Sequence, residues 1–140
     1  MCALACSCTK RVQGRWGDGE LRFEGRVSRL DGEREDLWTW WFPNGERREQ
    51  GRLEHGQRAG KWRQWYANGQ RRSEGEREPS ADGRASPREG FWQFWFENGE
   101  QSAKGVFIHG LREGHWDFYL TSGKLDGEHS GEYHLDQRIH

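Results

Sequence analysis

The chain has 140 residues, a length typical of one domain. Its 22 basic and 23 acidic side chains nearly cancel, so no overall field favours nucleic acid or an anionic membrane surface, and we expect no nucleic-acid partner. Nine Trp, seven Phe and three Tyr supply aromatic surface that disordered chains lack, while no apolar run approaches the ~18 residues of a membrane-spanning helix. We therefore expect a folded, soluble, cytoplasmic chain with a thin aromatic core.

Residues 1–11 precede the patterned part of the chain and are expected to be disordered or processed. All three cysteines (Cys2, Cys6 and Cys8) lie here, so they cannot cross-link the body of the fold, and a metal site would need a fourth ligand and a rigid frame. Leu4-Ala5-Cys6 resembles the end of a bacterial lipoprotein signal. A lipoprotein of the bacterial envelope, lipidated at Cys6, is therefore the alternative location. It requires a true start upstream of Met1, because the usual apolar segment of about 7–15 residues is absent.

From residue 12 onward, one unit recurs along the chain. Similar segments begin at Trp38, Trp62, Trp92 and Trp116, and a weaker copy around Trp16, Gly19 and Gly25 leads them. The copies are 24 residues apart except in the middle, where an insertion at 76–89 lengthens the interval to 30. We predict a single domain over 12–140, made of about five β-hairpin repeats with the bounds 12–37, 38–61, 62–91, 92–115 and 116–140.

Glycine positions predict how each unit turns. Asn44-Gly45, Asn68-Gly69 and Asn98-Gly99 suit the two-residue hairpin turn, in which both residues have positive φ. A further glycine follows six residues later, at Gly51, Gly75 and Gly105. Aromatic residues before the turns favour strands, and 20 glycines disfavour helices. The predicted fold is all-β, an elongated single-layer antiparallel sheet of stacked β-hairpin repeats.

Alternation along the strands separates two faces of this sheet. One face is the predicted core, with Trp38, Trp40, Phe42, Trp62, Tyr66, Trp92, Phe94, Phe96, Trp116, Phe118 and Leu120. The other face carries one aromatic column, Trp41, Trp65, Trp95 and Tyr119. Its rings belong to strands roughly 9–10 Å apart and cannot stack directly. We expect arginines of the intervening strands (Arg47, Arg48, Arg71 and Arg72) to fill the space between them.

The aromatic column has two interpretations. Its rings pack against neighbouring strand residues or a second copy of the chain, or they form a strip that binds a partner. Trp, Tyr and Arg dominate binding hot spots, so in the second case Trp41, Trp65, Trp95, Tyr119, Arg47 and Arg71 are the predicted partner-binding residues.

Other polar residues do not indicate catalysis, a metal or a cofactor. His129 and His134 differ by an odd number of positions and would face opposite sides of one strand, so they are interpreted as part of a solvated tail. His109 and His115 are predicted to lie at hairpin ends. Acidic residues alternate with arginines, a pattern typical of cross-strand ion pairs on a solvated face.

The pattern Gly-x-Trp-x-x-Trp/Tyr-Tyr/Phe-x-Asn-Gly, followed by a glycine six residues on, resembles the MORN-repeat family. It is most similar to the bacterial variant form with an antitoxin-like label. The resemblance covers about residues 12–135 and departs from the pattern at Asp36, at Ser122 and in the insertion. It implies a curved sheet of hairpins that serves as a protein-binding or assembly platform, sometimes contacts lipid, and is not itself catalytic. The label implies a toxin as partner.

Three functions remain open from the sequence. The first is a non-enzymatic scaffold that binds another protein, as an antitoxin or immunity-type partner. The second is a cell-wall or glycan binder, since aromatic platforms also suit sugar faces. The third is a membrane-surface lipoprotein, which the near-neutral charge disfavours. The open edges of a single sheet also predict self-association.

Overall fold

A computed structural model describes residues 8–140, and no helix occurs within that range. Eleven strands follow one another, joined by turns and loops. They are β1 (Thr9–Arg15), β2 (Leu21–Ser28), β3 (Arg34–Trp41), β4 (Arg47–Glu54), β5 (Gln57–Trp65), β6 (Arg71–Arg77), β7 (Arg88–Trp95), β8 (Gln101–Ile108), β9 (Leu111–Phe118), β10 (Gly131–His134) and β11 (Gln137–Arg138).

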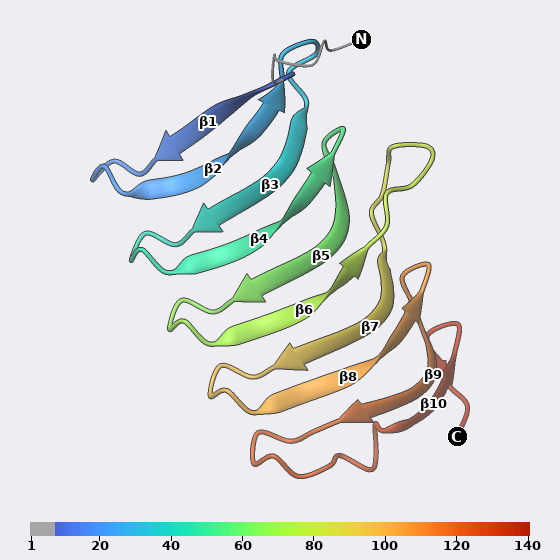
Figure 1. The fold of residues 1–140 in the computed structure, drawn as a ribbon. Helices are drawn as coiled ribbons and strands as arrows, with labels where there is room; N and C mark the ends of the chain where they lie inside the picture. The colour runs from blue at the N-terminus through green and yellow to red at the C-terminus, as the bar shows by residue number, and fades with distance from the viewer. Residues whose placement is uncertain (1–7) are drawn as a thin grey trace.

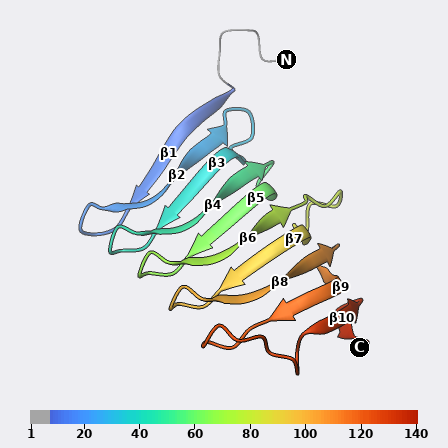
Figure 2. The ribbon, with the colours of Figure 1, turned by 60° about the horizontal axis from the view of Figure 1, so that its bottom comes forward.

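The strands form one open antiparallel sheet whose order is the order along the chain. The first and last strands therefore lie at opposite ends of an elongated array (Figure 1). A view from another side shows the same strands as a single curved layer (Figure 2). The predicted all-β, single-layer sheet of hairpins is confirmed.

The sheet begins earlier than the predicted repeats do. β1 starts at Thr9 and pairs residues 9–11 with 26–28 of β2, so residues 9–11 belong to the sheet and not to the segment predicted as disordered or processed over 1–11. The strand forms because Val12 packs against the core. Cys2 and Cys6, and with them the lipidation hypothesis, lie outside the described residues.

The core is a row of tryptophans, each lying on a glycine of the preceding strand. Trp38, Trp62, Trp92 and Trp116 are 1–2% exposed. A Cβ added to Gly25, Gly51, Gly75 or Gly105 would come within 3.0 Å of the indole that covers it. Each indole Nε1 donates a hydrogen bond to a backbone carbonyl, for example that of Trp62 to Arg52 at 3.1 Å. The glycines six residues after the turns are required because the indole occupies the space of a side chain.

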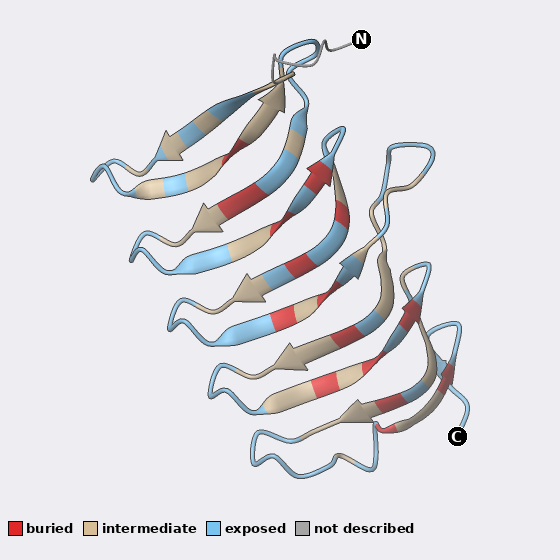
Figure 3. Ribbon diagram, viewed as in Figure 1, coloured by how far each residue is buried: buried red, intermediate tan, exposed pale blue. Residues whose placement is uncertain are grey.

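Further rings continue this row along the sheet. Trp40 stacks on Trp38 at 5.6 Å, and Phe118 stacks on Trp116 at 5.8 Å between ring centroids. Buried positions recur at the same level of successive strands (Figure 3). At the end of the predicted core row, Phe96 is half-buried and Leu120 is 48% exposed, because these residues reach the turns at the rim.

The Asn-Gly turns differ from the prediction. The Phe42 carbonyl accepts a hydrogen bond from the Gly45 N–H at 3.0 Å, and the Phe42 N–H donates to the Glu46 carbonyl at 2.8 Å, so the loop has three residues. Gly45 has positive φ (88°), but Asn44 does not. The same turn recurs in every repeat, including the one with Ser122 in place of asparagine. A three-residue loop with glycine in the left-handed region is the next commonest hairpin connection.

Two-residue turns occur at the opposite end of the hairpins. His55-Gly56 joins β4 to β5, and His109-Gly110 joins β8 to β9; all four residues have positive φ. The prediction that His109 lies at a hairpin end is confirmed. His115 was predicted there too, and this is wrong, because it lies inside β9.

Bulges bend the strands into a curve. The residue two positions before each core tryptophan has positive φ, with Asp36 at 61° and the glycines at positions 60, 90 and 114 between 63° and 72°. Strand register shifts at each of these positions, and such bulges sharpen local bending. Asp36 thus adopts the conformation of its glycine counterparts, so this departure does not interrupt the repeat.

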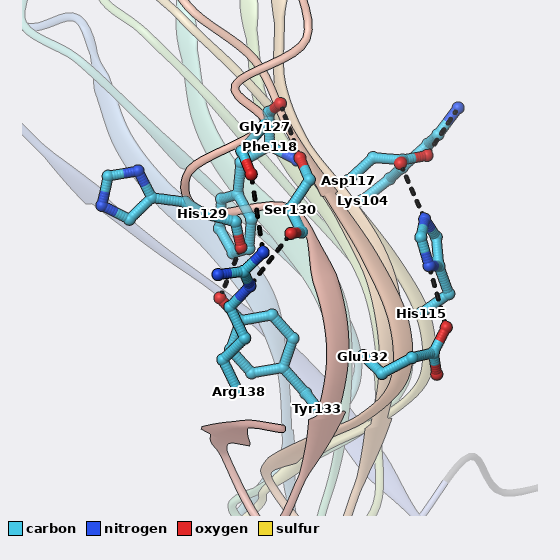
Figure 4. A network of polar contacts seen from close by, with 10 residues as sticks. All are labelled: Lys104, His115, Asp117, Phe118, Gly127, His129, Ser130, Glu132, Tyr133 and Arg138. Atoms are coloured by element: carbon cyan, nitrogen blue, oxygen red, sulfur yellow. Dashed lines mark hydrogen bonds and ion pairs between the residues drawn. The ribbon is translucent and has the colours of Figure 1, made fainter. Parts of the chain in front are cut away.

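The curvature defines an inner and an outer face. Figure 4 shows Tyr133 and Arg138 on the concave side of the sheet, and Lys104, Asp117 and His115 on its convex side. We call these sides the inner and outer faces. Tyr133 belongs to the aromatic core, so the core lies on the inner face. The inserted loop of the third repeat runs over 78–87, within the predicted range of 76–89, and projects beyond the strand ends (Figure 1).

Candidate functional site

The predicted aromatic column lies on the outer face. We call Trp41, Trp65, Trp95 and Tyr119 the outer column. Each alternates along its strand with core residues, and Tyr119 follows Asp117 by two positions. All four rings are half-buried. They are therefore packed by their neighbours and still reach solvent, and the interpretation as a partner-binding strip stays a prediction.

Arginines separate the rings, as predicted for Arg47 and Arg71. Arg47 pairs with Trp41 across β3 and β4, and its guanidinium lies 4.6 Å from the ring centroid of Trp65. Arg71 pairs with Trp65, and its guanidinium lies 5.9 Å from the ring of Trp95. Cations and rings therefore alternate across three repeats, a geometry in which each ring face attracts the neighbouring charge.

Arg48 and Arg72 were expected between the same rings, and this is wrong for both. Arg48 is the extra residue where the β3–β4 register shifts. Arg72 lies over Tyr66, with 5.7 Å between its guanidinium and the ring centroid. Arg47 and Arg48 are consecutive, as are Arg71 and Arg72, and alternation along a strand leaves only one residue of each pair on the outer face.

A carboxylate holds part of the column in place. Glu74 accepts contacts from Lys61 at 2.6 Å, Arg63 at 3.5 Å and Arg71 at 3.4 Å. Burial acts to raise the pKa of Glu74, but the Lys61 hydrogen bond and the three nearby cations outweigh it and leave the pKa below its usual value. Glu74 is therefore ionised at neutral pH. Glu74 pairs with Arg71 but not with Arg47. Within residues 8–140, Arg47 makes no ion pair and contacts the ring of Trp65.

A second polar network lies at the last repeat (Figure 4). His115 contacts Glu132 through Nδ1 at 2.9 Å and Asp117 through Nε2 at 3.0 Å. The hydrogen bonds to Glu132 and Asp117 raise the pKa of His115. Lys104 lies 3.7 Å from Asp117 and 5.7 Å from the ring of Tyr119. It supplies the cation for the last ring of the outer column.

Two shallow depressions flank the outer column. One, of about 550 Å³, lies over Gly25 and is lined by Leu37 and Trp41 among others. The other, of about 290 Å³, lies over Gly75 beside Arg71 and Phe91. Leu37 and Phe91 are 58% and 52% exposed. Leu37 and Phe91 were not predicted as surface residues of this face. Each directly precedes a core tryptophan, and alternation therefore places it on the outer face.

A row of arginines on the inner face was also missed. An arginine stands four residues before every core tryptophan, at Arg34, Arg58, Arg88 and Arg112. Three of them lie 4.6–5.1 Å from the tryptophan ring of their own strand, and Arg112 lies over Phe118 and Tyr133 instead. The regular spacing was visible in the sequence. A separation of four residues also places the arginine and the tryptophan on the same face of a strand, and the structure adds that the guanidinium lies over an aromatic ring.

His55, His109 and His134 also contact carboxylates. His55 lies near Asp31 and Glu33, and His109 lies near Glu78 and Glu89, in two groups compact enough for a metal ion. The backbone N–H of His109 donates to Glu89 Oε2 at 2.7 Å, so this carboxylate already binds the turn. His134, predicted in a solvated tail, lies in β10 and contacts Glu113 at 2.9 Å. The carboxylates near His55 and His109 therefore stabilise the two-residue turns.

Comparison with known proteins gives no assignment. No protein-family model and no curated protein matches the chain. Among the described residues, no helix has the length and apolar character to cross a membrane.

Proposed function

We propose that this chain is a non-enzymatic repeat scaffold that binds another protein through its outer column. The observation that supports this most is the alternation of half-buried rings with Arg47 and Arg71 on the open outer face. Binding hot spots are enriched in Trp, Tyr and Arg and are flanked by contacts that exclude water.

The geometry suits binding because the rings are held before a partner arrives. The indoles of Trp65 and Trp95 have few rotatable bonds and are already packed against a guanidinium, so little conformational entropy is lost on binding. Leu37 and Phe91 add exposed apolar surface beside the depressions over Gly25 and Gly75. Arg47 offers a guanidinium for a carboxylate of the partner. The complementary partner surface would carry apolar side chains around an acidic residue.

The resemblance to MORN repeats of the antitoxin-like form suggests one class of partner. A toxin or similar protein held in a stoichiometric complex fits a rigid scaffold without a catalytic centre. In this proposal the complex is cytoplasmic, and the outer column is covered when the partner is bound.

Affinity purification of the tagged chain from its native cells tests the proposal. Arg47→Ser and Arg48→Ser form a matched pair, because both remove an exposed arginine of β4 and only Arg47 covers a ring of the outer column. We expect a stoichiometric protein that is retained by Arg48→Ser and lost by Arg47→Ser and Trp65→Ser. Circular dichroism of each variant checks that the sheet is intact.

Other results would change the assignment. A partner retained by all three variants would remove the outer column from the interface. If no protein copurifies with any form, the result would favour the cell-wall or glycan-binding alternative. That alternative predicts binding of glycan without a protein partner. Self-association through the open edge of β1 is a separate prediction, and light scattering of the purified chain tests it.

A further inference from the structure

The inserted loop borders an open basic pocket beside β5 and β6. The pocket has a volume of about 320 Å³. Its lining consists of Gly56, Gln57, Arg58, Arg77, Gly83, Arg84, Ala85 and Ser86. Three of these eight residues are arginines, and none is a carboxylate.

Hydrogen bonds hold the loop over the pocket. Arg77 Nη1 donates to the Ser86 carbonyl at 2.8 Å, and the Ser80 N–H donates to Gln57 Oε1 at 3.1 Å. Asp82 accepts from the Ser80 hydroxyl at 2.6 Å and from the Arg84 N–H at 3.0 Å, so it is used within the loop. The pocket is thus formed by the chain before any ligand arrives.

Arg77 occupies a position that is apolar in the other repeats. Two residues after the glycine beneath each core tryptophan stand Val27, Leu53, Arg77 and Phe107. Leu53 and Phe107 are buried core residues, 4% and 6% exposed, and Val27 packs against the core. An arginine therefore replaces a core side chain only in the repeat that carries the inserted loop. Local rules of packing are broken in this way at functional sites.

Positive charge accumulates around this arginine and is only partly compensated. Arg77 and Arg88 face each other directly across β6 and β7, an arrangement of like charges that destabilises a sheet. The carboxylate of Glu49 lies 2.6 Å from Arg58 and is the single acid among the residues near Arg58, Arg77 and Arg88 that interact with them. Three guanidinium groups against one carboxylate leave two positive charges in excess.

The environment of Arg77 reflects this excess. Burial, followed by the charges of Arg58 and Arg88, lowers the pKa of Arg77 to about 10. The Nε atoms of Arg77 and Arg88 are buried without a hydrogen-bond partner among the described residues. A buried donor left unpaired is costly, and the excess positive charge around Arg77 favours an anionic ligand in the adjoining pocket.

We propose that this pocket binds the phosphate group of a small soluble phosphate ester, through Arg58, Arg77 and Arg84. Guanidinium groups match phosphate oxygens with paired hydrogen bonds, and an anion in the pocket offsets part of the excess positive charge around Arg77. The volume lies near the lower end of the range of about 300–1,000 Å³ for small-ligand pockets. The site lies on the opposite face from the outer column and is independent of the proposed protein partner.

Calorimetry and thermal unfolding at constant ionic strength test this, with inorganic phosphate and glucose 6-phosphate as probes and acetate and citrate as controls. We expect both phosphates to bind the full chain with a dissociation constant of about 1 mM or below and to raise Tm. Arg77→Leu restores the side-chain type of the sister repeats, so it should fold with unchanged or higher Tm and bind phosphate at least tenfold more weakly. Arg84→Gln should weaken phosphate binding by a similar factor. Arg72→Gln removes an arginine of β6 outside the pocket and should bind phosphate as the parent does.

The outcomes are distinguishable. Tighter binding of glucose 6-phosphate than of inorganic phosphate would identify an ester ligand, and equal binding would limit recognition to the phosphate group. Absence of phosphate binding by the parent chain overturns the proposal. So does equal binding by Arg77→Leu and the parent, or acetate or citrate binding as tightly as phosphate, since either result would indicate unspecific charge attraction.

Discussion

Gly75 lies directly beneath the indole of Trp92, so Gly75→Ala should destabilise the sheet strongly. A methyl group at this position would come within 3.0 Å of three indole atoms, whereas ordinary contacts begin at 3.4 Å. Gly75 has no positive φ, so backbone strain does not contribute. The ring must move, and its Nε1 would then lose the hydrogen bond of 2.9 Å to the Glu76 carbonyl. Overpacking costs about 1–3 kcal/mol and the hydrogen bond about 1 kcal/mol, so we expect a loss of roughly 2–4 kcal/mol.

Urea unfolding followed by circular dichroism and tryptophan fluorescence measures this loss. Gly127→Ala is the matched control, because its added methyl group has no atom within 4 Å and its φ is not positive. It should change the free energy of unfolding by less than about 0.5 kcal/mol. On a Trp92→Phe background, where the ring is smaller, Gly75→Ala should lower the free energy of unfolding by less. A double-mutant cycle detects this difference. A Gly75→Ala chain as stable as the parent would refute the role given to the glycine.

Three further changes test other parts of the structure. Asn68→Asp keeps the side-chain acceptor of its turn but loses the 2.8 Å hydrogen bond to the Glu97 carbonyl of the next repeat; urea unfolding should show a loss of about 1 kcal/mol, and no loss would mean that the contact does not couple repeats. His55→Ile should cost about 1–2 kcal/mol because His55 has φ of 49°, while His55→Asn should cost nothing in the same assay; equal stability of the two would contradict this. The pKa of His115 is raised by the Glu132 hydrogen bond and a second carboxylate, so its stabilising contribution is present below the unfolded pKa of about 6.5 and is lost as pH rises through the folded pKa. NMR titration should place the pKa of His115 above about 6.5. In the His115→Gln variant, the free energy of unfolding should no longer fall as pH rises through this pKa. A pKa at or below the ordinary value would contradict the geometry.

Periodic features of the chain were predictable because each unit repeats the same local requirement. The core tryptophans, the glycine beneath each of them and the alternation that separates Trp40 from Trp41 are all visible as spacing. These positions follow from strand geometry alone. The outer column and its two interleaved arginines were found in this way.

Irregular features were not predictable from spacing. Arg48 was expected beside Arg47 between the rings, although it is the extra residue of a bulge, and His115 was expected at a hairpin end because it lies near a loop in the sequence, although it belongs to β9. The Asn-Gly pairs were assigned a two-residue turn, yet an asparagine is compatible with either loop length, and the pairing of Phe42 with Glu46 selects the longer one. Local sequence permits several turns, and the register of the flanking strands chooses between them.

By itself, the sequence determined that the chain is a row of hairpins with an aromatic core, because ring, turn and glycine recur at constant intervals. Only the tertiary structure decided what the insertion does. Arg77 stands at a core position in the linear pattern, and its partners Arg58 and Arg84 come from the neighbouring strand β5 and from the inserted loop. They meet because the sheet curves at its bulges and the inserted loop folds back over β5 and β6, and the path of that loop is not given by the repeat spacing.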